Sequence, residues 1–289
     1  MNKDAIAIAR IKRASEIAQA RGMGPLYVGY SGGKDSTVLA DLAIRAGVPI
    51  EIAHNHTTID APETVYFVRR EMARFEAIGG VKCTVYMPRY KGKPVSMWTL
   101  IPQKLMPPTR VVRYCTSVLK QSHSAGRFSL TGVRWDEIVR RKKTRGIFEA
   151  PHRDPEKRLR LTSDQGNLTA LTEAKRELIC NPIVDWTEAD VWDYIRDRHL
   201  PYNPLYDDEG CKRIGCIGCP LAGKHRWTEF ARWPAYEKLY IMAFDWMISA
   251  RKAAGKRCEW ETGRDVFHWW MEDGVLPGQI EMEDLLREE

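Results

Sequence analysis

Short apolar segments recur through the first 200 residues, and longer segments that mix apolar and charged residues separate them. Each short segment is rich in Val, Ile, Leu, Phe or Tyr and is bounded by glycine, proline or charged residues, which is typical of buried β-strands. The pattern predicts five strands, over residues 25–30, 48–55, 81–87, 128–134 and 177–184.

The longer segments predict amphipathic helices. Apolar residues recur at helical spacing over residues 3–22, from about Ser36 to Gly47, and from Pro62 to about Ile78. Strands that alternate with helices of about ten to fifteen residues are typical of a doubly wound α/β fold, with a mostly parallel sheet and helices on both faces. We therefore predict a five-stranded sheet of this kind.

Two regions interrupt this alternation. Residues 144–176 are polar and rich in glycine, proline and charge, which predicts an excursion from the sheet. After Pro201 no strand is predicted, and the remaining apolar segments predict helices rich in aromatic residues. We predict an α/β domain over 1–200 and a C-terminal region over 201–289, in which a cysteine loop and a helical tail pack on that domain.

The composition is that of a globular protein. Hydrophobic residues make up 44% of the 289 residues and charged residues 29%, which argues against a disordered or collagen-like chain. Lys and Arg outnumber Asp and Glu by 45 to 38, and this net charge of +7 suits an anionic partner. No apolar run approaches the roughly 20 residues of a membrane span. We therefore expect a soluble, cytoplasmic protein without a membrane partner.

A glycine turn joins the first predicted strand to the helix that follows it. The turn reads Ser31-Gly32-Gly33-Lys34-Asp35-Ser36. Two glycines allow a tight turn in which N–H groups converge, the lysine adds a positive charge, and the helix N-terminus adds its dipole. The turn therefore predicts a phosphate site, and it matches neither the Walker A pattern nor the GxGxxG fingerprint. An ordinary glycine-rich turn is the structural alternative.

The turn and four further motifs resemble those of the phosphoadenosine phosphosulfate (PAPS) reductase family, within the PP-loop ATP pyrophosphatase superfamily. SGGKDS is the signature of that superfamily. The other motifs are similar to the family's DTG…PET, RxCTxxLK, TGxR and NPLxDWTxxDVWxYI segments, and they follow the family's order at residues 54–64, 113–120, 131–134 and 181–195. The resemblance implies an adenine nucleotide α-hydrolase-like α/β fold and binding of ATP or of a PAPS-like or adenosine phosphosulfate (APS)-like nucleotide.

The resemblance also implies the residues of the nucleotide site. The expected nucleotide-binding residues are Ser31, Gly32, Gly33, Lys34, Asp35, Ser36, His54, Asp60, Gly132 and Arg134. Among them Lys34, Asp35 and Arg134 are the expected catalytic residues, and Mg²⁺ is expected to bridge the phosphates. Arg134 is assigned to the phosphate or sulfate end because a forked guanidinium suits an oxyanion. A surface ion pair is the alternative role for this arginine.

Seven cysteines in a chain without a recognised export signal favour a metal site over a disulfide framework. Cys211, Cys216 and Cys219 have the CxxxxCxxC spacing of plant-type ferredoxins, and the inner CxxC is also half of a common zinc site. Gly215 and Gly218 allow the tight loop that such ligands require. Spacing alone therefore predicts a metal site and leaves an iron–sulfur cluster and zinc open.

The family resemblance narrows the ligand set. Residues 202–206 and 215–220 resemble the NxLY…GCxPC stretch of APS reductases that bind a 4Fe–4S cluster. Cys115 stands where those enzymes have two adjacent cysteines. The resemblance therefore implies a 4Fe–4S cluster with Cys115, Cys216 and Cys219 among its ligands.

The fourth ligand is either Cys180 or Cys211. Cys180 precedes the Asn-Pro that ends a predicted strand, near the carboxyl edge of the sheet where α/β folds place their sites. Cys211 has the ferredoxin-like spacing instead. We favour Cys180 and keep Cys211 as the alternative.

The expected reaction depends on one cysteine of the reductases that has no counterpart in this sequence. PAPS and APS reductases use a cysteine in a C-terminal ECGxH segment, whereas no cysteine follows Cys258 here. We therefore predict an ATP pyrophosphatase of the sulfur-transfer branch, which includes DNA phosphorothioation enzymes and tRNA thiolases. Such an enzyme would cleave ATP to AMP and pyrophosphate, adenylate an acceptor and transfer sulfur. The alternatives are a PAPS or APS reductase and a nucleotide- or nucleic-acid-binding component of a multi-protein system.

A basic segment predicts a further partner. Residues 134–160 contain ten Lys or Arg and five Asp or Glu. Such a segment is suited to the phosphates of DNA or tRNA, and a solvated helix face with a loop is the alternative. A protein that donates sulfur is also an expected partner.

Overall fold

The computed structural model describes residues 2–121, 123–137, 139–152, 154–164, 166, 169–173, 177–208 and 211–272. The end of the predicted C-terminal region, residues 273–289, lies outside these. The chain forms two compact units, each built from segments that are far apart in the sequence. The first comprises Met1–Asn55, Pro62–Tyr86 and Gln121–Ile214, and the second comprises His56–Ala61, Met87–Lys120 and Gly215–Glu289.

The first unit is built on a seven-stranded sheet with the order β3-β2-β1-β6-β9-β7-β8. Its first five strands pair in parallel and are β1 (Leu26–Gly29), β2 (Ile50–Asn55), β3 (Lys82–Tyr86), β6 (Phe128–Leu130) and β9 (Leu178–Cys180). All five predicted strands are therefore confirmed, and so is the mostly parallel α/β class.

The predicted number of five strands is wrong, because the segment over 144–176 also contributes to the sheet. β7 (Phe148–Ala150) pairs with β9, and β8 (Leu159–Leu161) pairs with β7, both in the antiparallel sense. Each has a charged residue at its centre, Glu149 in β7 and Arg160 in β8, and is surrounded by charged residues and prolines, so neither gives the apolar signal that predicts β6 and β9. The segment that was expected to leave the sheet thus adds two antiparallel strands at one side of it.

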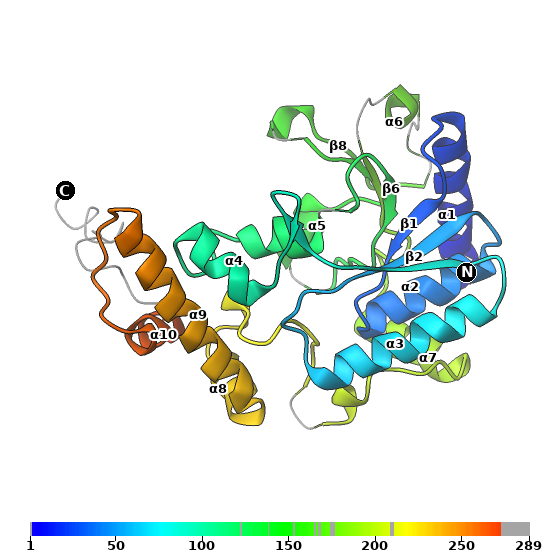
Figure 1. Cartoon of the computed structure of the whole chain (residues 1–289). Helices are drawn as coiled ribbons and strands as arrows, with labels where there is room; N and C mark the ends of the chain where they lie inside the picture. The colour runs from blue at the N-terminus through cyan, green and yellow to red at the C-terminus, as the bar shows by residue number, and fades with distance from the viewer. Residues whose placement is uncertain are drawn as a thin grey trace, which may run out of the picture. The chain divides into compact units, whose positions relative to one another are not determined.

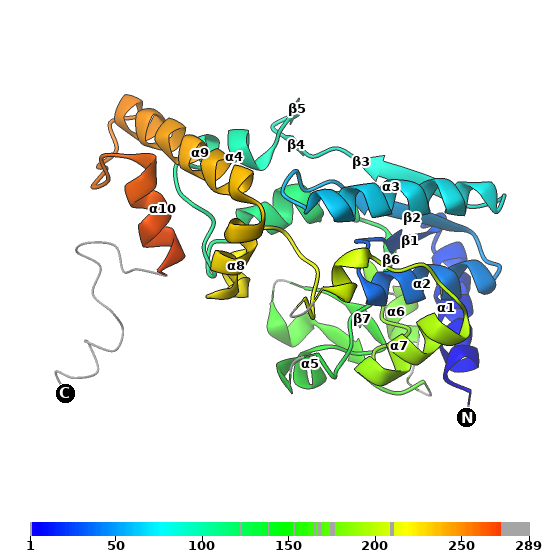
Figure 2. The ribbon, with the colours of Figure 1, turned by 90° about the horizontal axis from the view of Figure 1, so that it is seen from below.

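Helices of the first unit pack on the sheet face that carries Val28 and Leu130. α1 (Lys3–Ala20), α2 (Lys34–Arg45) and α3 (Pro62–Ala77) follow the predicted helices, and their apolar sides share one core with these strands (Figure 1). α7 (Glu188–Asp197) lies against α2 and begins at a capping box formed by Thr187 and Asp190 (Figure 2). The shorter helices are α5 (Val139–Thr144), α6 (Thr169–Glu173), η2 (Pro155–Lys157) and η3 (Pro204–Asp207).

The second unit is mostly helical. The aromatic helices expected after residue 201 are present as α9 (Pro234–Ala253) and α10 (Gly263–Met271), and they are preceded by η4 (Pro220–Ala222) and α8 (His225–Arg232). The elements of residues 87–120 were not predicted and are β4 (Arg89–Tyr90), β5 (Lys93–Pro94), α4 (Met97–Lys104) and η1 (Thr116–Lys120). In the described part of the chain, no helix has the length and apolar character required to cross a membrane.

Aromatic side chains form the core of the second unit. Phe230, Phe244 and Trp270 are buried, and each makes a ring contact with Tyr240 at a centroid separation between 4.8 and 5.9 Å. Edge-on and tilted contacts of this kind add to the free energy gained by burying the rings. They fix α8, α9 and α10 against one another within this unit.

The first unit also buries a carboxylate on the other face of its sheet. Glu51 of β2 is 3% exposed and accepts hydrogen bonds from Tyr86 Oη and from Arg127 Nη2, each at 2.8 Å. Burial by itself raises the pKa of Glu51, but hydrogen bonds from Thr84, Tyr86 and Arg127 outweigh it and lower the pKa to about 2. The charged carboxylate therefore stabilises this side of the sheet.

We expect Glu51→Gln to lower the free energy of unfolding at neutral pH by about 2–3 kcal/mol, because it leaves Arg127 without its charged acceptor. The folded-state pKa of Glu51 lies below the ordinary value of 4.5, so its contribution is present above that value and is lost as the pH falls toward 2. Urea unfolding measured from about pH 6 to pH 3 should show a shallower pH dependence for the variant. Glu76→Gln, an exposed position on α3, is the control. Parallel pH profiles for the wild type and Glu51→Gln would contradict this account.

Candidate functional site

The turn between β1 and α2 is the first candidate site, and it lies in the first unit. Ser31 Oγ lies 3.2 Å from Ser36 Oγ, which also donates to the carbonyl of Gly33 at 2.8 Å. Gly32 has a φ of 77°, and a Cβ there would lie 2.7 Å from Val68 Cγ2, so only glycine fits. α2 begins at Gly33 without a side-chain cap. The positive end of the helix dipole is therefore not neutralised by a capping side chain.

Two buried cations lie at this turn. Lys34 is 4% exposed and Arg134 is 1% exposed. Arg134 Nε donates to Asp35 Oδ1 at 2.6 Å, and Lys34 Nζ lies 3.9 Å from Asp35 Oδ2. Gly132 permits this approach, because a Cβ there would lie 3.1 Å from the backbone of Asp35. The structure thus brings together the glycine turn, Gly132 and Arg134, which the family resemblance placed in one site.

Two further residues contact this site that sequence reasoning missed. Glu188, the first residue of α7, places Oε1 3.7 Å from Lys34 Nζ and Oε2 3.8 Å from Arg134 Nη2. Tyr206 accepts a hydrogen bond from the Lys34 N–H at 3.1 Å, and burial raises the pKa of Tyr206 to about 12. Both residues lie in motifs that resemble the family, but a motif match does not tell which side chains turn toward the site.

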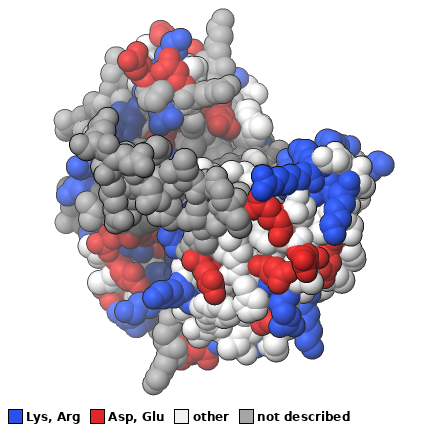
Figure 3. All heavy atoms as spheres, turned by 90° about the vertical axis from the view of Figure 1, so that its left-hand side faces the viewer, with Lys and Arg blue, Asp and Glu red and all other residues white. Residues whose placement is uncertain are grey.

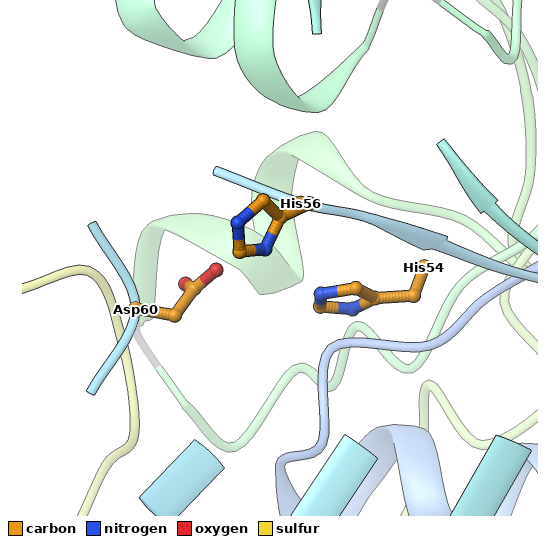
Figure 4. Close-up of side chains that lie close together, drawn as sticks. All are labelled: His54, His56 and Asp60. Carbon is orange, nitrogen blue, oxygen red and sulfur yellow. The ribbon is translucent and has the colours of Figure 1, made fainter. Parts of the chain in front are cut away.

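His54 and Asp60, which were also expected to bind the nucleotide, belong to different units. His54 is buried near the end of β2 in the first unit, where its Nδ1 lies 2.9 Å from the carbonyl oxygen of Tyr30. Asp60 belongs to the second unit, and its carboxylate lies within 4.8 Å of a ring nitrogen of His56 (Figure 4). Their role in nucleotide binding stays a prediction.

A cavity in the second unit is the second candidate site. Its volume is about 40 Å³, room for about three water molecules. Cys115, which precedes η1, and Cys216 and Cys219, which precede η4, all line it. Lys120 and Thr57 line it as well. The structure thus brings together the three cysteines that the family resemblance implies as ligands.

The loop between Cys216 and Cys219 has a shape that only glycine permits. Gly218 has a φ of 73°, and a Cβ there would lie 2.7 Å from the Phe230 ring. The Gly218 N–H donates to Glu229 Oε2 at 2.8 Å, which ties the loop to α8. Burial raises the pKa of Glu229. Both cysteines are thereby held on a rigid turn.

Lys120 places a positive charge beside the sulfur atoms. Its side chain hydrogen-bonds to Cys216, whose Sγ also lies 3.9 Å from Asp60 Oδ1. The negative charge of Cys216 as thiolate raises the pKa of Lys120, against the effect of burial, and Asp60 adds to the shift. Burial raises the pKa of Cys216 to about 11, and burial together with Cys219 raises that of Cys115. Burial thus favours the neutral thiols of both cysteines, and the Lys120 charge acts in the opposite direction on Cys216.

The two candidates for a fourth ligand, Cys180 and Cys211, belong to the first unit. Cys180 is fully buried at the end of β9, with its Sγ 4.0 Å from the carbonyl oxygen of Arg10 on α1. Burial raises the pKa of this thiol strongly. Cys211 is partly exposed, and its Sγ lies 4.0 Å from the carbonyl oxygen of Arg213. Neither is among the residues that line the cavity described above.

The basic segment over 134–160 is partly neutralised by its own acidic residues. Arg134 is buried at the glycine turn and is not available to a partner at the surface. Other basic residues form ion pairs within the segment, namely Arg141 with Glu137, Arg145 with Glu149 and Lys157 with Asp154. On the face drawn in Figure 3, groups of Lys and Arg side chains lie next to groups of Asp and Glu side chains. Binding of DNA or tRNA by this segment stays a prediction.

Comparisons with known proteins agree with the sequence motifs. Residues 25–222 match the phosphoadenosine phosphosulfate reductase domain. An uncharacterized protein of Methanocaldococcus jannaschii is 26% identical over 260 residues, which cover 88% of this chain and 55% of that protein. Sulfate adenylyltransferase subunit 2 of Methylobacterium sp. is 32% identical over 191 residues, which cover 61% of this chain and 57% of that subunit. The chain thus spans about half the length of these curated relatives.

A solved structure shows a weaker overall likeness. The crystal structure of PAPS reductase from Candida auris, in complex with phosphate, has a TM-score of 0.43 and 18% sequence identity. The alignment covers 70% of this chain and 87% of that one.

We expect Gly218→Ala to lower the free energy of unfolding by about 3 kcal/mol, because the added Cβ must displace the Phe230 ring while the residue keeps a positive φ. Gly255→Ala is the matched control, since Gly255 has a φ of 65° and nothing lies within 4 Å of its Cβ position. It should cost only about 1 kcal/mol. Urea unfolding measures both values, and an equal loss in the two variants would contradict the proposed packing of the loop.

Proposed function

Because the chain belongs to the phosphoadenosine phosphosulfate reductase family, we propose that it is an enzyme that uses ATP to activate an acceptor for sulfur transfer. The observation that carries this proposal is that Cys115, Cys216 and Cys219, three soft sulfur ligands, line one cavity in a chain that also has the glycine turn with its two buried cations. In the proposed reaction an acceptor oxygen attacks the α-phosphorus of ATP and pyrophosphate leaves. Sulfur from a donor then displaces AMP from the acceptor.

The first unit would bind the nucleotide. The N–H groups of the glycine turn and the dipole of α2 favour phosphate oxygens, and Lys34 and Arg134 supply two positive charges. These charges are already in place before the ligand arrives, because both side chains are buried and Asp35 orients Arg134. Lys34 would stabilise the negative charge that develops on the pyrophosphate, and Mg²⁺ would enter with the nucleotide.

The second unit would hold a 4Fe–4S cluster. The donor set fits such a group, because three thiols line one cavity and the Lys120 ammonium offsets part of the negative charge of their thiolate forms. When bound, an iron–sulfur cluster supplies iron that binds sulfur. Lys120 holds its proton beside Cys216 and so favours the thiolate form of that ligand. Zinc on the same cysteines is the alternative.

We expect the anaerobically purified protein to release pyrophosphate from radiolabelled ATP when tRNA or DNA is offered as acceptor. Lys34→Ala should lower the rate at least about 100-fold, because it removes a charge that is present before the leaving group forms. Lys12→Ala, at an exposed position of α1, is the control and should keep the rate. Release of sulfite from PAPS or APS, with no pyrophosphate from ATP, would contradict this proposal and identify a reductase.

We expect the same preparation to contain iron and acid-labile sulfide, and Cys115→Ser, Cys216→Ser and Cys219→Ser to lose most of both. Cys180→Ala and Cys211→Ser decide the fourth position. Because the Cys180 sulfur is enclosed in the core of the first unit, we expect Cys180→Ala to retain its iron. Cys83→Ser, on β3, is the control for a general effect of removing a thiol. If the protein instead contains one tightly bound zinc ion and no sulfide, the cluster proposal is wrong and the cysteines form a zinc site.

A further inference from the structure

The carboxylate of Glu188 lies between the two buried cations of the first unit. Its Oε1 lies 3.7 Å from Lys34 Nζ, and its Oε2 lies 3.8 Å from Arg134 Nη2. One carboxylate thus faces both positive charges, each through a different oxygen. An oxyanion of a bound ligand would take the same position between the same two cations.

Glu188 is held more loosely than Asp35, the other acidic neighbour of both cations. Asp35 Oδ1 accepts a hydrogen bond from Arg134 at 2.6 Å, and its side chain is 24% exposed. The Glu188 side chain is 54% exposed, and its two contacts with the cations are longer than hydrogen bonds. Glu188 is therefore the acid that can be displaced while Asp35 keeps Arg134 in place.

Arg134 also has a guanidinium nitrogen that can donate a hydrogen bond to a ligand oxygen. Its Nη1 is buried and lies 3.5 Å from Asp136 Oδ2, but it has no hydrogen-bond partner among the described residues. A buried guanidinium nitrogen without an acceptor is unfavourable, and a ligand oxygen would relieve this cost. The same arginine thus has one nitrogen fixed by Asp35 and another without an acceptor.

The backbone of Glu188 is fixed although its carboxylate is not. Its N–H donates to Asp136 Oδ2 at 3.0 Å, and the capping box of Thr187 and Asp190 sets the start of α7. The side chain reaches the cations through its rotatable bonds and can turn toward solvent without any change in the helix. The structure therefore carries a built-in anion at the position where a ligand anion would bind.

We propose that Glu188 is a specificity-determining residue that competes with ligand phosphates for Lys34 and Arg134. The inference rests on the proposed function, because it places nucleotide phosphates at this turn. A metal-free polyphosphate brings the largest negative charge toward the carboxylate and is repelled most, whereas its Mg²⁺ complex carries less charge and is repelled less. Glu188 thereby makes the site favour the magnesium complex of a nucleoside triphosphate over the metal-free nucleotide.

The test compares ATP binding by the wild type and by Glu188→Gln, which keeps the shape of the side chain and removes its charge. In isothermal titration with EDTA, we expect the variant to bind ATP about tenfold more tightly than the wild type. In excess Mg²⁺ the ratio should fall below about threefold, and in EDTA it should shrink as salt is added. Asp193→Asn is the matched control, since it makes the same charge change on the same helix at a side chain that is 60% exposed and paired with Arg196.

The outcomes separate this inference from the function on which it rests. Equal affinity of the wild type and Glu188→Gln for metal-free ATP would overturn the inference and leave ATP binding intact. Weaker binding by the variant would also overturn it, because the carboxylate would then assist the ligand. Failure of both proteins to bind ATP, with or without Mg²⁺, would overturn the inference and the proposed function together. Glu188→Ala should change the affinity in the same direction as Glu188→Gln, and thermal unfolding checks that each variant is folded.

Discussion

The ion pair between Asp35 and Arg134 is the interaction on which the first candidate site depends. The two residues are 99 positions apart in the chain, and each follows a strand of the sheet. β1 and β6 pair in parallel, so their carboxyl ends lie next to each other, and Gly132 leaves room for the turn to approach. An almost fully buried guanidinium would be strongly unfavourable without a carboxylate partner. The contact that makes this burial tolerable is thus also the contact that aims a cation at the glycine turn.

In the second unit, too, a contact between distant segments places a positive charge beside a candidate site, in this case beside the cysteine sulfur atoms. Cys216 and Cys219 lie on a loop whose geometry requires Gly218, and Lys120 provides the charge that their thiolate forms need. The aromatic core beneath that loop leaves no space for a side chain at Gly218. Packing and chemistry are therefore coupled here, because a change in the core would move the sulfur atoms.

The fold was largely predictable from the sequence, and its exceptions have physical causes. The four inner parallel strands, β2, β1, β6 and β9, are short, apolar and largely buried, so they leave a clear pattern in the sequence. β7 and β8 show no such pattern, because each has a charged residue at its centre. α4 packs on α9, more than 100 residues later in the chain, so its local sequence carries little information about its place in the fold. Glu188 and Tyr206 were missed for a related reason, since each is ordinary in its own segment and acquires a role only through contact with Lys34.

By itself the sequence determined the α/β class, the positions of the five parallel strands along the chain and the glycine turn, and the family resemblance pointed to the three cysteines that line one cavity. The strands and the turn are local features, because apolar patterning and glycine freedom act within a few residues, whereas Cys115 lies about 100 residues from Cys216 and is linked to it only by the family resemblance. The tertiary structure alone decided that Arg134 is buried beside Asp35, that Glu188 lies between the two cations, and that Lys120 stands beside Cys216. Each of these contacts joins segments distant in the chain, and its strength depends on how far burial excludes water, which no single segment specifies.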